Sequence, residues 1–176
     1  WLIAVMPELL ERGCQFVILG SGEARYEEPL KLLARQWPDQ MSLTLGYDEG
    51  LSHRITGGCD LFLMPSRFEP CGLNQMYSLR YGTVPVVHGV GGLSDTVKDP
   101  REVGIDNANG FRFSEASAPA LLDAVNRALE CFRKRKQWRR LLQNAMAADY
   151  SWKHRAREYG NLYQTILNER QHQPQD

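Results

Sequence analysis

The fold of this chain is decided by Pro65-Ser-Arg-Phe-Glu-Pro-Cys-Gly-Leu-Asn-Gln-Met-Tyr-Ser-Leu-Arg-Tyr-Gly82. The preceding residues, 59–65, are mostly apolar, which is typical of a parallel strand covered by helices on both faces. Pro70 pushes the backbone of Glu69 toward an extended conformation. A helix is expected over residues 74–81, ended by Gly82. The stretch therefore predicts a strand, a loop with one carboxylate, and a helix.

The start of this predicted helix has the features of an anion site. Gly72 has no side chain, so the backbone N–H groups of Cys71, Gly72 and Leu73 are expected to point outward unobstructed. Free N–H groups at a helix N-terminus attract phosphate. The alternative is ordinary helix capping, which satisfies the same N–H groups. The two interpretations are compatible, and together they predict a phosphate site at this turn.

Composition restricts the classes of protein to consider. The chain has 176 residues, enough for one domain with a full core, and 43% of them are hydrophobic. Lys plus Arg and Asp plus Glu each number 21, so the net charge of +0 suggests neither nucleic acid nor a membrane surface as partner. Four scattered cysteines without a C-x-x-C pair argue against a zinc site or a redox dithiol, and favour reduced thiols in a cytoplasmic protein.

Strands and helices are expected to alternate along the chain. This order predicts an α/β fold with a doubly wound, Rossmann-like parallel sheet in a single domain over residues 1–176. From about residue 117 to 168 the pattern is helical. Ligands bind at the carboxyl ends of strands in such sheets, so the loops after the strands should share one rim. These loops follow Gly20, Leu45, Pro65 and His88.

The central stretch, followed by Gly91-Gly92-Leu93-Ser-Asp-Thr-Val97, resembles bacterial glycogen synthase and plant starch synthase. The resemblance extends upstream to Gly46-Tyr47 and downstream to Tyr150-Ser-Trp152. It implies a GT-B glycosyltransferase that retains configuration and moves glucose from ADP-glucose to an α-1,4-glucan. It also implies no metal or other cofactor, and a bacterial cytoplasmic or plastid stromal location. The chain would be the C-terminal half, so its other partner would be an N-terminal domain of the same protein, and the isolated chain should be inactive.

The resemblance also implies roles for individual residues. Glu69 would contact the donor sugar and act in catalysis, whereas its alternative is a surface carboxylate. The amides of Cys71, Gly72 and Leu73 would hold the donor diphosphate. Asn74 stands where bacterial members usually have Thr, and it can still cap or hydrogen-bond. Tyr47 would stack on adenine, whereas its alternative is a half-buried rim tyrosine.

Two positions depart from related patterns. Many GT-B enzymes carry a second glutamate eight positions after the first, and here that residue is Tyr77, as expected for the glycogen and starch synthase branch. His88-Gly89-Val90 stands where the family commonly has Arg and Thr, which puts the contacts of that loop in question. Two other functions stay open: a GT-B transferase with a different nucleotide-sugar, and a non-catalytic module that binds nucleotide or glucan.

Overall fold

The computed structural model describes residues 1–171, without the side chains of residues 154, 155 and 169–171. Residues 172–176, the end of the predicted domain, lie outside the described part. The chain divides into two compact units, Trp1–Met146 and a second that begins at Ala147. A single domain over the whole chain therefore stays a prediction. Within the described residues, no helix combines the length and the apolar character that crossing a membrane requires.

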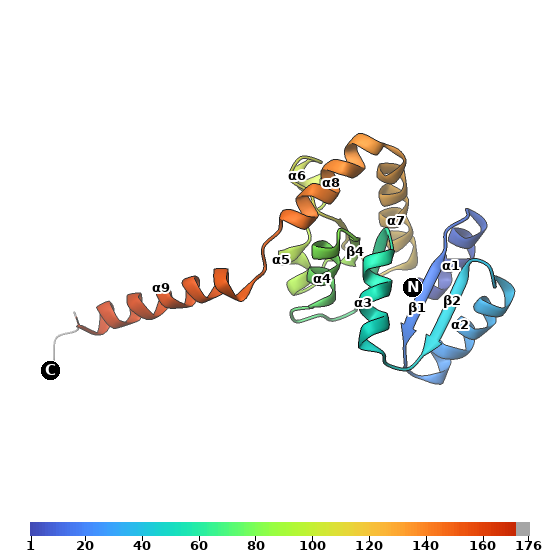
Figure 1. Ribbon diagram of the computed structural model, residues 1–176, viewed down its shortest axis with the longest axis horizontal. Coiled ribbons are helices and arrows are strands. Elements are labelled where there is room, and N and C mark those ends of the chain that lie inside the picture. The colour runs from blue at the N-terminus through green and yellow to red at the C-terminus, as the bar shows by residue number, and fades with distance from the viewer. Residues whose placement is uncertain (172–176) are drawn as a thin grey trace. The chain divides into compact units, whose positions relative to one another are not determined.

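The first unit alternates helices and strands in the order expected from the sequence (Figure 1). Two short helices after the fourth strand, α5 and α6, were not expected. The second unit contains α9 (Trp152–Gln171). The elements of the first unit are α1 (Leu2–Glu11), β1 (Phe16–Gly20), α2 (Ala24–Gln36), β2 (Met41–Leu45), α3 (Glu49–Gly58), β3 (Leu61–Met64), α4 (Asn74–Tyr81), β4 (Val84–His88), α5 (Gly92–Thr96), α6 (Pro100–Val103), β5 (Phe111–Phe113), α7 (Ala118–Arg133) and α8 (Arg135–Ala147).

The five strands of the first unit all pair in parallel, which confirms the predicted strand direction. They form two hydrogen-bonded groups, β1–β2 and β3–β4–β5. Every residue of β4 is buried, because β4 has a strand on each side and also contacts the helices α4, α5 and α7. The residues of β3 are only half-buried, since β3 is an edge strand of its group. Burial on both faces, which the sequence predicted for β3, therefore applies to β4.

The main core lies between β4, β5 and the helices α1, α7 and α8. Its members are apolar residues whose side chains are almost completely shielded from water. Burying each such side chain stabilises the fold by roughly 1.5–3 kcal/mol. The core therefore supports β4 from one side, and the loop that follows β4 starts from a fixed point. These residues include Leu9, Val84, Val86, Phe111, Leu121 and Leu141.

The predicted end of α4 at Gly82 is confirmed, and the start of α3 is also capped. The carboxylate of Asp48 accepts a hydrogen bond from Leu51 N at 2.8 Å and caps α3. Gly82 ends α4 with a φ of 78°, in the left-handed region that glycine enters without strain. These caps fix where α3 begins and where α4 ends beside the predicted site.

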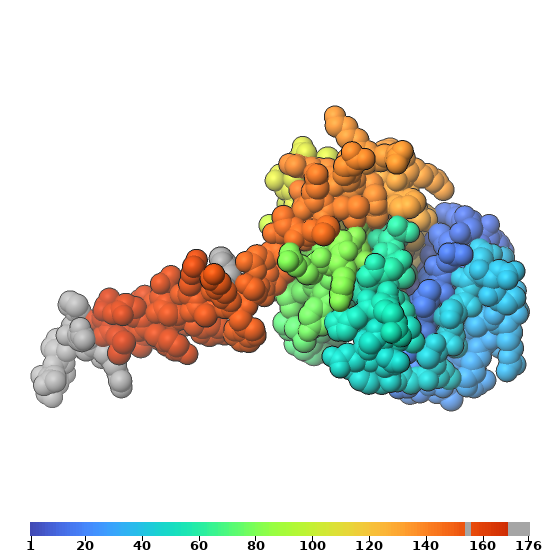
Figure 2. Space-filling view, in the orientation of Figure 1, coloured from blue at the N-terminus to red at the C-terminus, as the bar shows by residue number. Residues whose placement is uncertain are grey.

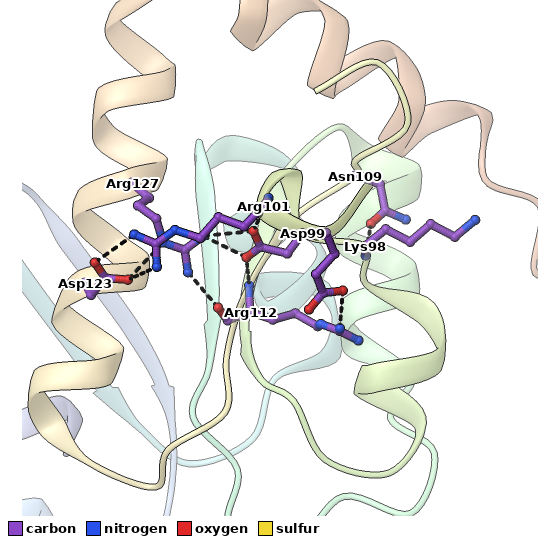
Figure 3. Close-up of polar contacts among 8 residues, drawn as sticks. Lys98, Asp99, Arg101, Asn109, Arg112, Asp123 and Arg127 are labelled. Carbon is purple, nitrogen blue, oxygen red and sulfur yellow. Dashed lines mark hydrogen bonds and ion pairs between the residues drawn. The ribbon is translucent and has the colours of Figure 1, made fainter. Parts of the chain in front are cut away.

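A buried ion pair between Asp99 and Arg127 connects the segment that follows α5 with the helix α7 (Figure 3). Asp99 is 2% exposed, and its carboxylate accepts from Arg127 Nη1 at 2.8 Å and from Arg112 N at 2.7 Å. Arg127 also donates to Arg112 O at 2.7 Å and to Asp123. Burial disfavours the ionised form of Asp123, but hydrogen bonds from Arg127 and Arg101 outweigh this effect and lower its pKa. The charges in this cluster are thus fully partnered, as a structural role requires.

Replacing Arg127 with Met should destabilise the protein strongly. The change leaves the buried carboxylate of Asp99 without its cation, which costs about 3–5 kcal/mol of unfolding free energy. Arg101→Met is the matched control, because it breaks the exposed contact with Asp123 and should cost less than about 1 kcal/mol. Urea unfolding measures both. Equal losses in the two variants would show that burial of the pair does not matter.

Candidate functional site

Residues 65–73, called here the motif loop, connect β3 to α4 and carry Glu69, which is half-buried. The residue that caps α4 is Leu73, and within the described part of the chain no side-chain cap is found for the first amides of the helix. Asn74 is the first helical residue and is exposed. The capping role considered for Asn74 is therefore wrong. The start of α4 is left without a side-chain cap.

Three successive amides at this turn are available to a ligand. Among the described residues, no hydrogen-bond acceptor is found for the backbone N–H of Cys71, Gly72 or Leu73. Gly72 has a φ of 73°, so the chain turns sharply where α4 begins. Orphan N–H groups at a helix start need a partner, and an anion is well suited to that place. The geometry therefore agrees with the phosphate site predicted from the sequence.

Residues 89–92, called here the glycine loop, lie directly against the motif loop. Gly92 N donates to Pro70 O at 3.3 Å. A Cβ on Gly91 would overlap the carbonyl oxygen of Glu69, and a Cβ on Gly92 would overlap that of Cys71. Both glycines are thus required by a contact of backbone against backbone. This contact holds the carboxylate-bearing loop in place from the side of β4 and α5.

His88 ties together the ends of β3, β4 and β5. It is 5% exposed, and its Nδ1 lies 2.7 Å from Ser66 O while its Nε2 lies 3.3 Å from Ser114 O. Its ring also stacks on Phe113, with centroids 5.1 Å apart. His88 therefore serves the structure of the rim.

The predicted common rim is seen within each group of strands. The loops after β3 and β4 meet through His88 and Ser66, as just described. The loops after β1 and β2 meet where Gly46 N donates to Gly20 O at 3.0 Å. One rim shared by all four loops stays a prediction.

Tyr47 projects into solvent between β2 and α3. Its side chain is 86% exposed, and no hydrogen bond or ring contact is found for it within the described residues. The alternative of a half-buried rim tyrosine is therefore wrong. An unencumbered aromatic face is what stacking on a flat base requires.

A contact between α3 and α4 was missed by the sequence analysis. His53 Nδ1 lies 3.1 Å from the hydroxyl of Tyr81, and the ring centroids of His53 and Tyr77 are 5.8 Å apart. Figure 2 shows the teal residues of α3 adjoining the green residues of α4 on this face. The i, i+4 spacing of Tyr77 and Tyr81 indicates that both lie on one face of α4. No pattern in the sequence indicates that this face contacts His53 of α3.

The cysteines show no sign of nucleophilic or metal chemistry. Burial raises the pKa of the Cys14, Cys59 and Cys131 thiols. Cys71 is exposed, and its Sγ lies 3.6 Å from Gly72 O with no His among its described contacts. Among the side chains that the structure describes, no group of three or more His, Cys, Asp or Glu is arranged to hold a metal ion.

A surface hollow lies elsewhere, at the start of α8. Its volume is about 830 Å³, and it is lined largely by cations, including Arg135, Lys136, Arg139 and Arg140. None of its lining residues belongs to the motif loop. We assign the functional site to the motif loop, because unpartnered amides, a carboxylate and enforced glycines meet there, whereas long cationic side chains around an open hollow are typical of a solvated face.

Gly72→Ala should destabilise the protein more than a positive φ alone explains. A left-handed residue with a Cβ costs about 1–2 kcal/mol, and at Gly72 the Cβ would also press on the buried amide of Gln75, whose Nε2 would be 2.9 Å away. Gly13→Ala is the matched control, with a φ of 83° and nothing within 4 Å of its Cβ. Urea unfolding compares them. Equal destabilisation would show that the side chain of Gln75 leaves enough space for a Cβ at Gly72.

The family follows from comparison with known proteins. Residues 1–144 match the family described as glycosyl transferases group 1. This match covers most of the sequence, so the chain belongs to the group 1 glycosyl transferases. The chain is 63% identical over 175 residues to a glycogen synthase of Marinobacter nauticus and 57% identical over 163 residues to one of Anaeromyxobacter dehalogenans. The resemblance stated from the motifs is thereby confirmed.

The alignments cover 98% and 93% of this chain but only 36% and 34% of those two relatives. The chain thus spans about a third of the length of the curated relatives it matches. Among solved structures, it is similar to the catalytic domain of starch synthase IV from Arabidopsis thaliana bound to ADP and acarbose. The TM-score is 0.82 at 37% identity, over 94% of this chain and 35% of that one.

A more distant solved structure shares the fold alone. Sucrose-phosphate synthase from Thermosynechococcus elongatus matches 88% of this chain and 39% of its own, with a TM-score of 0.60 at 21% identity. Together with starch synthase IV, it confirms the predicted α/β architecture as one half of a GT-B glycosyltransferase fold.

Proposed function

We propose that this chain is the C-terminal, donor-binding domain of a retaining glucosyltransferase that moves glucose from ADP-glucose to the non-reducing end of an α-1,4-glucan. The observation that carries this proposal is the uncapped turn at the start of α4, where free amides adjoin the Glu69 loop. The similarity to glycogen synthases and to a starch synthase bound to ADP supports the choice of donor.

Three parts of the site divide the work in this proposal. The amides of Gly72 and Leu73 hold the diphosphate and stabilise the charge that grows on it as ADP leaves. Glu69 orients the glucose ring. Tyr47, exposed at the end of β2, stacks on adenine. Fixed donors aimed at developing charge lower a barrier because they need no reorganisation during the reaction.

The proposed transfer takes place on one face of the sugar. The acceptor hydroxyl oxygen bonds to the anomeric carbon while the bond from that carbon to the phosphate oxygen breaks. The hydroxyl proton passes to the leaving phosphate, so ADP departs and the configuration is retained. The chain's residues position the donor, and no metal or other cofactor is included in the proposal.

We also propose that a further domain of the same protein completes the cleft. Arg67 is the one cation within the motif loop, and its guanidinium lies over the ring of Trp1, 5.6 Å from the centroid. Other cations must neutralise the diphosphate, and the length of the relatives leaves ample chain to carry them. The isolated chain should therefore make no glucan.

Glu69→Gln in the full-length protein tests the proposal. It should lower the turnover number about a hundredfold or more, the usual effect of removing one preorganised group from the reacting centre. The affinity for ADP should stay within about twofold, because Glu69 is assigned to the sugar rather than the nucleotide. Turnover with ADP-glucose and a glucan primer, and ADP calorimetry, give the two numbers. An unchanged turnover number would remove Glu69 from the mechanism.

Changes at Tyr47 should affect ADP affinity, in contrast to the change at Glu69, because Tyr47 is assigned to the nucleotide rather than to the sugar. Tyr47→Ala should weaken ADP binding by roughly 1–3 kcal/mol, the worth of one aromatic–base stack, whereas Tyr47→Phe keeps the ring and should be nearly silent. Calorimetry with ADP measures both variants. If Phe were as damaging as Ala, the hydroxyl would be the important group and the stacking role would be wrong.

A further inference from the structure

Gln75 is a polar side chain that the fold buries completely in the first turn of α4. Its Nε2 donates to Cys71 O at 3.1 Å and to Gly72 O at 2.9 Å. An amide oxygen in that position would face two carbonyl oxygens, so these contacts fix which way round the side-chain amide lies. Gln75 therefore holds two peptide groups of the motif loop by hydrogen bonds from the buried side of that loop.

The same amide links the motif loop to the glycine loop. Gln75 Nε2 also lies 3.2 Å from Thr96 Oγ1, and that hydroxyl donates to Gly92 O at 2.6 Å. Gly92 N in turn donates to Pro70 O, one residue before Cys71. The bonds form a closed ring through both loops and the start of α4. A displacement of either loop would strain this ring.

The hydrogen bonds from Gln75 to these two carbonyls also determine where the N–H groups of the same peptides point. In a trans peptide, the C=O and the N–H of the same group point in opposite directions, and the described chain has no cis peptide. The carbonyls of Cys71 and Gly72 share their peptide groups with the N–H of Gly72 and Leu73. Because Gln75 holds these carbonyls inward, the two N–H groups face away from it. They are the same amides that lack an acceptor.

This arrangement is not the one that stability alone would favour. Gln75 Oε1 is buried and has no hydrogen-bond partner within the described residues. An unsatisfied buried acceptor costs free energy, and an apolar side chain of similar volume would avoid that cost. The side-chain amide of Gln75 is therefore better explained by the hydrogen bonds that its Nε2 donates to the motif loop than by a contribution to the stability of the core.

We propose that Gln75 is a positioning residue, which sets the amides of Gly72 and Leu73 for the donor diphosphate by holding the carbonyls of the same peptide groups. This inference rests on the proposed function, since it takes the diphosphate as the ligand of those amides. Gln75 touches no substrate in this role. Thr96 is its second support, because Thr96 connects the amide to Gly92.

Gln75→Met in the full-length protein is the main test, because Met keeps the volume and loses the donor. Its Kd for ADP, measured by calorimetry, should rise about tenfold or more, the worth of a hydrogen bond to a charged group. The KM for ADP-glucose should rise with it, while the KM for the glucan primer stays unchanged. If the substitution only destabilised the fold, a smaller fraction of the protein would be folded. The apparent kcat would then fall, while both KM values and the Kd for ADP would stay unchanged.

Ser78→Ala is the matched control, because Ser78 is equally buried on α4 and its hydroxyl donates to the backbone oxygen of Gln75 rather than to either loop. It should lower the temperature of unfolding and leave the Kd for ADP unchanged. Thr96→Val is the second variant should Gln75→Met fail to fold. It should weaken ADP binding, whereas Thr96→Ser, which keeps the hydroxyl, should restore it.

The outcomes separate this inference from the proposed function. If the unaltered protein fails to bind ADP, the proposed function is wrong. If the unaltered protein binds ADP, and Gln75→Met and Thr96→Val bind it equally tightly, Gln75 is an ordinary structural residue and the positioning role is refuted. Weaker ADP binding in Ser78→Ala by the same factor would also refute it, because general loosening of α4 would then explain the effect.

Discussion

The contact between the motif loop and the glycine loop is the constraint on which the site depends. Two backbones approach so closely that neither Gly91 nor Gly92 has room for a Cβ, and Gly92 N donates to Pro70 O across the gap. A contact of this kind is rigid, because no flexible side chain can give way. It fixes the loop that carries Glu69 at the mouth of a parallel sheet, where such folds bind ligands.

The rest of the first unit keeps that contact in place. Strand β4 is buried along its whole length and runs straight into the glycine loop. His88, its last residue, has its two ring nitrogens close to the carbonyl oxygens of Ser66 and Ser114 and so joins three strand ends. The ion pair of Asp99 and Arg127 anchors the segment that returns from α5 to β5 (Figure 3). The core and the ion pair provide stability, and the loops they hold still provide the site.

The sequence predicted the turn at the start of α4 better than the contacts that support it, for a physical reason. Pro70, Gly72 and Gly82 impose local backbone geometry, so the turn at the start of α4 and the end of that helix could be inferred from neighbours in the chain. The grip of Gln75 on the loop and its link to Thr96, 21 residues away, depend on tertiary packing that no local pattern encodes. The exposure of β3 was missed for the same reason, since strand order across a sheet is not a local property.

Amide NMR of the 176-residue chain during a titration with ADP would show whether the turn at the start of α4 binds the diphosphate, since chemical shifts report even weak binding. We expect the backbone N–H resonances of Gly72 and Leu73 to move most, together with the ring signals of Tyr47. Unmoved Gly72 and Leu73 resonances, with the largest shifts instead around the basic hollow at Arg135 and Arg139, would contradict it.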